Sequence, residues 1–126
     1  DNELLNEVTG LCEWPVALLG NFRNNFLSVP SEALISSMRE HQKYFHTNDK
    51  NNNLCSSFVT ISNIESKSSK QVIAGNEKVV NARLSDAMFF YEQDTRESLH
   101  SKTDRLKQVV FQKDLGSIYD KTQRIK

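Results

Sequence analysis

SKQVIAGNEKVVNARLSDAMFFYEQD, residues 69–94, is the longest run in the chain with a sustained helical period. Apolar side chains recur in it three and four residues apart, which predicts one long amphipathic helix with a single buried stripe. The expected members of this stripe are Val72, Ile73, Val80, Leu84, Ala87, Met88 and Tyr91. Gly75 lies inside the helix, where glycine costs about 1 kcal/mol relative to alanine, so we expect another backbone to approach the helix closely there.

Polar residues interrupt the apolar stripe of this helix. Arg83 and Asp86 are three residues apart, a spacing at which side chains pair, and Asn76 lies seven residues before Arg83 on nearly the same face. We interpret Asn76, Arg83 and Asp86 as a structural polar ladder that fixes the helix against its neighbour. The alternative is that Lys78 and Arg83 contact RNA phosphate.

Two helices are predicted ahead of residue 69, over residues 2–13 and 31–41, because both segments space their apolar side chains at helical intervals. Ser31 is expected to cap the second of them, since serine is a favoured N-cap residue. Residues 16–19 form a short apolar run that fits either a strand or one helical turn. Residues 26–29 are expected to be extended.

A β-hairpin is predicted after these helices. Residues 42–47 and 55–64 read as strands, and the asparagine-rich loop 48–53 between them is typical of an antiparallel hairpin. An isolated hairpin is only marginally stable, so helices of this chain or strands of a longer chain must cover it. Lys43, at the start of the hairpin, is a candidate for contact with an RNA backbone, with helix capping and surface hydrogen bonding as the alternative.

Further helix is predicted beyond the long one. Residues 96–112 have apolar side chains at helical spacing, residues 115–117 interrupt the pattern, and another helix begins at residue 118. The side chains expected to face inward in the first of these segments are Leu99, Leu106, Val109 and Val110. The predicted fold class is therefore α+β, with a small antiparallel hairpin or sheet packed with several helices and long C-terminal helices.

Length and composition fit one domain over residues 1–126, divided into an α/β unit (1–68) and a helical part (69–126). The share of hydrophobic residues is 37% and that of charged residues 25%, as in ordinary globular chains. The formal net charge is zero, so the chain as a whole carries no strong electrostatic footprint for nucleic acid. No apolar run approaches the length of a membrane span, and two cysteines are too few for a disulfide framework.

No catalytic, cofactor or metal site is predicted. Residues 75–78 (GNEK) lack the flanking glycine and the following serine or threonine of a phosphate-binding loop. His41 and His46 have no acid or cysteine at a spacing suited to metal binding. No serine or cysteine nucleophile has a recognisable base partner, so the residues alone indicate no reaction.

Several runs along the chain carry a family resemblance. They are residues 13–16 (EWPV), 26–30 (FLSVP), Met38 with 41–45 (HQKYF), 62–65 (SNIE), 75–80 (GNEKVV), 82–87 (ARLSDA) with 89–90 (FF), and 111–112 (FQ) with 115–117 (LGS) and 120–121 (DK). In order and spacing, over essentially the whole chain, this set resembles the β subunit of the bacterial heterotetrameric glycyl-tRNA synthetase.

The resemblance implies a segment of a cytoplasmic enzyme that joins glycine to tRNA using ATP and Mg. In that family the α subunit carries the class II aminoacylation core, and the β subunit supplies tRNA recognition and assembly. The segment corresponds to a middle-to-N-terminal portion of β, ahead of its HD-like and C-terminal anticodon-binding regions.

The resemblance therefore implies a noncatalytic segment without a cofactor of its own. Its expected role is architecture, with tRNA or the α subunit as possible contacts and neither membrane nor DNA as a partner. Lys43, Lys78 and Arg83 are the expected tRNA contacts. An independent protein-interaction module and a hydrolytic, editing-type domain are the alternatives.

Overall fold

The computed structural model describes residues 1–125 and has the α+β architecture that the sequence predicts. Its elements are, in chain order, α1 (Asn2–Leu11), β1 (Val16–Asn21), the 3₁₀ helix η1 (Asn24–Ser28), α2 (Ser31–Gln42), β2 (Phe45–Asn48), β3 (Leu54–Ser62), α3 (Ser69–Arg96), the 3₁₀ helix η2 (His100–Gln108), β4 (Val110–Gln112), β5 (Gly116–Ser117) and α4 (Ile118–Ile125). Contacts divide the chain into a first unit, Asp1–Phe89, and a second unit, Phe90–Lys126. This boundary lies within α3, and the expectation of one domain stays a prediction.

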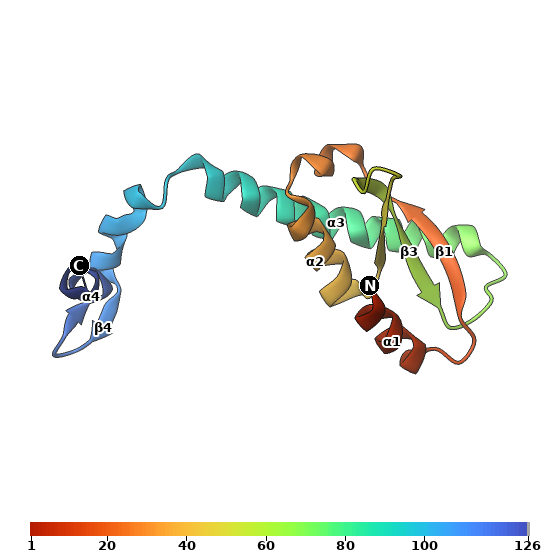
Figure 1. Cartoon of the computed structure of the whole chain (residues 1–126), viewed down its shortest axis with the longest axis horizontal. Helices are drawn as coiled ribbons and strands as arrows, with labels where there is room; N and C mark the ends of the chain where they lie inside the picture. Colours follow the sequence, from red (N-terminus) through yellow and green to blue (C-terminus); the bar gives the residue numbers. More distant parts are fainter. Residues whose placement is uncertain (126) are drawn as a thin grey trace. The chain divides into compact units, whose positions relative to one another are not determined.

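The first unit is built on a three-stranded antiparallel sheet in the order β1–β3–β2 (Figure 1). The predicted hairpin is confirmed, since β2 and β3 pair antiparallel with Phe45 opposite Val59. The ambiguous run at residues 16–19 is a strand, β1, which pairs with the other side of β3 over its whole length. Successive side chains of a strand alternate, so those of the central strand β3 point in turn to the two faces of the sheet.

One face of the sheet carries the core of the first unit. Phe58 of β3 is fully buried, and the ring of Tyr44 stacks on it with centroids 5.0 Å apart. The core cluster comprises Phe22, Phe26, Val29, Leu34, Met38, Tyr44, Phe58, Val80 and Leu84. Burying an aliphatic or phenylalanine side chain contributes about 1.5–3 kcal/mol, so this cluster holds η1, α2 and α3 against the sheet.

The predicted long helix is confirmed as α3, with Val80 and Leu84 buried. The close backbone approach expected at Gly75 is not found among the described residues. The tightly packed glycine is Gly20, where an added Cβ would lie 2.5 Å from Cζ in the ring of Phe58. A Cβ on Gly75 would meet nothing within 4 Å among the described residues outside its own stretch of helix. The expectation was wrong because Gly75 lies on the side of α3 opposite Val80 and Leu84.

Two predictions near α2 are wrong. The segment expected to be extended forms η1, which buries Phe26 and ends where the N–H of Val29 donates to the carbonyl oxygen of Phe26 at 2.9 Å. Pro30, not Ser31, holds the N-cap position of α2, and the hydroxyl of Ser31 donates to the carboxylate of Glu32. Burial of an aromatic ring and the fixed φ of proline override the local preferences behind both predictions.

The second unit contains η2, β4, β5 and α4, and none of its described residues (90–125) is buried. The helix predicted over residues 96–112 is wrong, because the chain forms η2 and then β4, which pairs with β5. Leu99 and Val110, expected to face inward, are 86% and 72% exposed. The valines at 109–110 and the phenylalanine after them favour a strand, and Gly116 supplies the positive φ of the turn. The last predicted helix is confirmed as α4.

Candidate nucleic-acid interface

Two polar side chains of α3 reach the end of strand β1. Oε1 of Glu77 accepts a hydrogen bond from the N–H of Asn21 at 2.8 Å. Oδ1 of Asn81 accepts one from the N–H of Arg23 at 3.2 Å. Because β1 is an edge strand, its outward backbone groups have no further strand to pair with. Glu77 and Asn81 therefore give the chain that leaves β1 the partners it needs.

A third polar side chain, Asn76, joins α3 to the start of β2. Its Oδ1 accepts a hydrogen bond from the hydroxyl of Tyr44, and its Nδ2 donates to the carbonyl oxygen of Val72 at 2.8 Å. Burial raises the pKa of Tyr44, so its hydroxyl stays protonated at neutral pH and remains a donor. A buried tyrosine hydroxyl usually needs such a partner, and the pair therefore fixes the position of α3 against the hairpin.

The residues predicted to form the polar ladder lie in different environments. Asn76 makes the contact to the hairpin, whereas Arg83 and Asp86 are exposed. No ion pair within 4.0 Å joins Arg83 to Asp86 in the part of the chain that the structure describes. The polar contacts next to Asn76 come from Glu77 and Asn81, which sequence reasoning missed. Their four-residue spacing along the edge of the buried stripe is the signal that points to them.

Lys43 makes contacts within the chain. It ends α2 in the left-handed conformation with φ 56°, and its N–H donates to the carbonyl oxygens of Arg39 and Met38. Its Nζ lies 2.8 Å from Oε1 of Glu7, and Arg39 likewise pairs with Asp1 at 3.3 Å. These ion pairs join α2 to α1, so the ammonium of Lys43 already has a carboxylate partner.

Lys78 and Arg83 lie on the exposed surface of α3. Five residues of helix rotate a side chain by about 140°, so these two cations point in different directions. A shallow hollow beside the helix is lined by Arg23, Lys78, Asn81, Ala82 and Ser85. Arg23, which sequence reasoning missed, thus adds a positive charge beside Lys78. Over residues 1–125, neither Lys78 nor Arg83 makes an ion pair within 4.0 Å.

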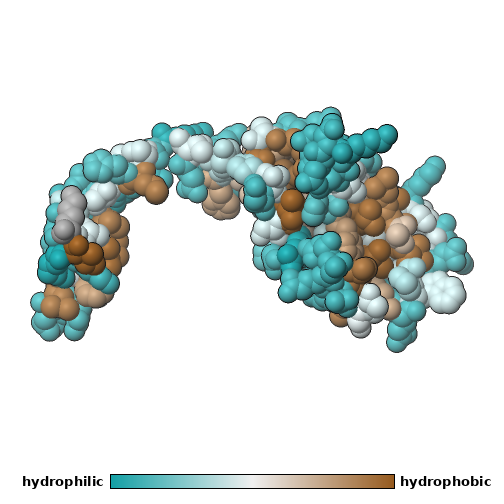
Figure 2. Space-filling model, viewed as in Figure 1, coloured by the Kyte–Doolittle hydropathy of each residue, from teal (hydrophilic) through white to brown (hydrophobic). Residues whose placement is uncertain are grey.

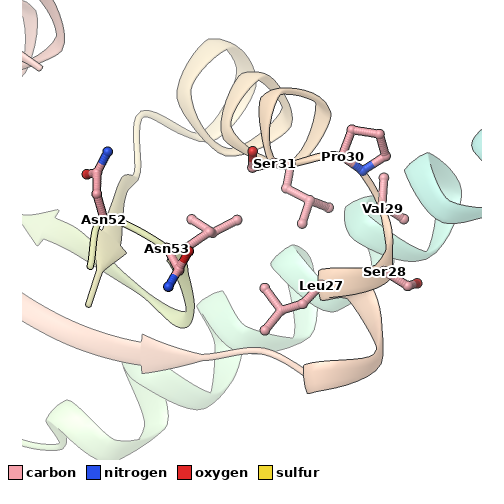
Figure 3. Close-up of a pocket in the computed structure, with 9 residues that line it drawn as sticks. Leu27, Ser28, Val29, Pro30, Ser31, Asn52 and Asn53 are labelled. Atoms are coloured by element: carbon pink, nitrogen blue, oxygen red, sulfur yellow. The ribbon is translucent and has the colours of Figure 1, made fainter. Parts of the chain in front are cut away.

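A groove beside the start of α2 is a second candidate site (Figure 3). Its walls come from the junction of η1 and α2 on one side and from the β2–β3 loop on the other. The lining residues are Leu27, Ser28, Val29, Pro30, Ser31, Leu34, Asn52, Asn53 and Leu54. None of these side chains is an acid, a histidine, a cysteine or a lysine, so the groove offers its serines no base and no general acid.

Asp49 lies in the loop that forms one wall of this groove. Its carboxylate accepts hydrogen bonds from the N–H groups of Asn53 and Asn51, both at 2.8 Å, and from the side-chain amide of Asn53. These bonds, those from Asn53 first, lower the pKa of Asp49. The carboxylate therefore holds the shape of the loop.

Within residues 1–125, no group of three histidine, cysteine, aspartate or glutamate side chains is placed to hold a metal ion. Over the same residues, every helix is too short or too polar to cross a membrane.

Four of the runs that carry the family resemblance, all in the first unit, meet in two pairs. Oδ1 of Asn63 accepts hydrogen bonds from the N–H groups of Glu13 and Trp14, at 2.7 and 2.9 Å, which joins residues 62–65 to residues 13–16. The bond from Tyr44 to Asn76 joins residues 41–45 to residues 75–80 in the same way. The four runs that these bonds join therefore stabilise the first unit.

Comparison with known proteins agrees with the resemblance. Residues 1–126 match the family described as glycyl-tRNA synthetase beta subunit. A glycine–tRNA ligase beta subunit of Marinobacter nauticus is 58% identical over 125 residues, and one of Chromohalobacter salexigens is 56% identical; each match covers 99% of this chain and 18% of the relative. One of Pseudomonas fluorescens is 54% identical over 122 residues, with 97% of this chain and 18% of the relative covered.

The matches place the chain among the subunits of aminoacyl-tRNA synthetases. Within that class, it belongs to the glycyl-tRNA synthetase beta subunit family. The chain spans about 18% of the length of the curated relatives that it matches.

Proposed function

We propose that the whole protein is the β subunit of a glycine–tRNA ligase, which acts with an α subunit to attach glycine to tRNA using ATP and Mg. The observation that carries this proposal is the identity of 58% over 99% of the chain with a relative of that name. The test is glycylation of tRNA by the full-length protein mixed with the α subunit of the same source. Absence of glycylation by an intact, folded mixture contradicts the proposal.

We further propose that residues 1–126 are a noncatalytic, architectural segment of that subunit. The polar side chains of α3 that make contacts, Asn76, Glu77 and Asn81, bond to the chain's own backbone or to Tyr44, which supports a structural role. The groove of Figure 3 has no titratable lining residue, so it lends no support to a hydrolytic, editing-type site. Glycine-dependent ATP–pyrophosphate exchange by residues 1–126 alone would contradict this role.

Lys78 and Arg83 are proposed as contacts to tRNA phosphate. Their exposure on α3 and the absence of an ion-pair partner for either within residues 1–125 support this assignment, and Arg23 adds charge beside Lys78. Each phosphate contact that is removed lowers the slope of log affinity against log salt by about 0.7–0.9. We therefore expect Lys78→Gln and Arg83→Gln, in the full-length enzyme, to weaken tRNA binding and flatten its salt dependence.

The matched control is Lys50→Gln, which removes an exposed lysine from the β2–β3 loop. It should leave the affinity and its salt slope unchanged. If Lys50→Gln, Lys78→Gln and Arg83→Gln all weaken tRNA binding equally, only the net charge of the protein matters. If none of the three changes tRNA binding, the proposed contacts are excluded.

Lys43 needs a different design because it pairs with Glu7. If Lys43 contacts tRNA or the α subunit, Lys43→Gln weakens that binding while Glu7→Gln, which frees the lysine, leaves it intact or strengthens it. If the ion pair is only structural, both substitutions lower stability to a similar small extent and neither changes affinity. Binding of each variant to tRNA and to the α subunit, measured separately, distinguishes these outcomes.

A further inference from the structure

Part of the outer face of the first unit's sheet is apolar, whereas Asn21, Thr47 and Ser57 make the remainder of that face polar. Along β1, Ala17 and Leu19 point away from the buried Leu18, because successive side chains alternate. The register places Ala17 opposite Ile61 and Leu19 opposite Val59, and Val59 in turn opposite Phe45. We call Ala17, Leu19, Phe45, Val59 and Ile61 the outer sheet face. Leu19 is 58% exposed, Ala17 is exposed, and the other three are partly exposed.

Helix α1 extends this apolar surface. A small groove between α1 and β3 is lined by Leu5, Val8, Thr9, Cys12, Pro15 and Ile61. The hydroxyl of Thr9 donates to the carbonyl oxygen of Leu5 at 2.7 Å, so it is already satisfied. Leu5 and Leu11 are 53% and 64% exposed. Figure 2 shows hydrophobic residues gathered over β1 and β3 and beside α1.

The composition of this surface indicates that protein covers it. An antiparallel sheet with one face in water normally carries polar side chains on that face, whereas a contiguous exposed apolar surface marks an interaction site. The outer sheet face contains no lysine or arginine, so it has no cation with which to attract phosphate. Its apolar character resembles that of surfaces that stay permanently buried.

We propose that the outer sheet face and the adjacent groove pack against another part of the same polypeptide, within one β subunit. This inference rests on the proposed function, because it requires the whole protein to be a β subunit as long as its relatives. The match covers 18% of a relative, so about four-fifths of such a polypeptide lies outside it. Those residues are tethered to this face and reach it at an effective concentration that no separate partner matches.

The test is thiol labelling of the full-length β subunit. Cys12 and Cys55, which are partly exposed and form no disulfide, are first replaced by serine. Leu19→Cys then reports on the outer sheet face, and Lys50→Cys in the β2–β3 loop is the exposed control. A maleimide is added to β alone, at two concentrations, then to β with the α subunit, and then to both with tRNA. Each rate is divided by the rate of the same variant in denaturant.

The proposal predicts that Leu19→Cys in β alone reacts about tenfold or more slowly relative to its denatured rate, at both concentrations, while Lys50→Cys reacts freely. Reaction of Leu19→Cys as fast as that of the control overturns the proposal. Protection that appears only with the α subunit, or only with tRNA, overturns the proposal and identifies that molecule as the partner of the outer sheet face. Protection that appears only at the higher concentration overturns the proposal and identifies a second copy of β.

If Leu19→Cys fails to fold, Ala17→Cys probes the same face with a smaller change. Glycylation by the same preparations with the α subunit is recorded separately. Loss of glycylation in the unsubstituted protein bears on the proposed function, whereas the labelling rate alone decides the packing surface.

Discussion

The two units of the chain are stabilised in different ways. The first unit has a buried core shared by η1, α2, α3 and the sheet, and its polar contacts join residues up to 58 positions apart. In the second unit no residue of the described range 90–125 is buried, and its interactions are local. They include the stacking of Lys121 over Phe111 at 4.2 Å. Tertiary packing therefore determines the structure of the first unit, whereas turn and cap residues determine the structure of the second.

Removing one aromatic ring from each unit gives the largest expected contrast. Phe58→Ala empties the centre of the core and should lower the free energy of unfolding by about 3–5 kcal/mol. Phe111 is 40% exposed and its ring lies under Nζ of Lys121, so Phe111→Ala should cost about 0.5–1 kcal/mol. Urea unfolding of residues 1–126 measures both, and equal losses would contradict the proposed difference between the units.

The same difference explains which parts of the fold could be predicted. The spacing of apolar residues in the sequence was sufficient to predict α3, the hairpin and α4. The run at residues 16–19 is too short for its period to separate strand from helix, and its pairing with β3 decides the matter. The spacing at residues 96–112 suggested a buried stripe, but no such burial occurs in the described part of the second unit, and the β-branched Val110 begins strand β4.

The candidate site was predicted less completely than the fold. Periodicity favours a polar ladder that includes Arg83, whereas the structure leaves both Arg83 and Lys78 exposed on α3. Periodicity does not reveal that Arg23, 55 positions before Lys78, lines the same hollow. Nor does it show that Lys43 pairs with Glu7, because both contacts depend on how separate elements pack.

Two glycines provide the next test, with effects of opposite sign. Gly20→Ala forces a Cβ to within 2.5 Å of the Phe58 ring, and overpacking of this kind costs about 1–3 kcal/mol. Gly75→Ala adds a methyl group in open space within α3 and should stabilise residues 1–126 by up to about 1 kcal/mol. Thermal or urea unfolding measures both changes. A loss of stability from Gly75→Ala would mean that the helix is packed at that point.

The contact between α3 and β1 provides a smaller effect. Asn81→Ala leaves the N–H of Arg23 without its acceptor, and because this bond is exposed to water we expect a loss of about 0.5–1 kcal/mol. Ser85→Ala, one turn further on, removes only a bond to the helix's own backbone and should change stability by less than about 0.5 kcal/mol. Hydrogen exchange of the backbone N–H of Arg23 measures the local loss of this hydrogen bond. Unchanged protection in Asn81→Ala would show that the bond does not hold the strand end.

The smallest expected effect concerns the start of α4. Oδ2 of Asp120 accepts hydrogen bonds from the N–H and the hydroxyl of Ser117, both at 2.7 Å, and these bonds lower the pKa of Asp120 below its ordinary value of 3.8. A carboxyl whose pKa is lower in the folded state than in the unfolded state stabilises the fold at pH values above the unfolded-state pKa. This stabilisation is lost as the pH falls through the folded-state pKa. The helix should therefore loosen only below about pH 3.8.

Nuclear magnetic resonance titration of the Asp120 carboxyl tests this prediction. Ser117→Ala should raise its pKa toward the ordinary value, and Asp120→Asn should abolish the pH dependence of the α4 signal. A pKa of Asp120 that does not respond to Ser117→Ala would contradict the assigned cause.

We propose that the polar residues of α3 stabilise the fold of this segment and perform no chemistry. The direct measurement compares Glu77→Ala with Glu77→Gln in the full-length β subunit combined with its α subunit. We predict that Glu77→Ala lowers the melting temperature of β, that Glu77→Gln largely restores it through an amide oxygen for the Asn21 N–H, and that the folded fraction of both glycylates tRNA at the unaltered rate. Unchanged melting temperature with glycylation abolished in both variants would contradict the account.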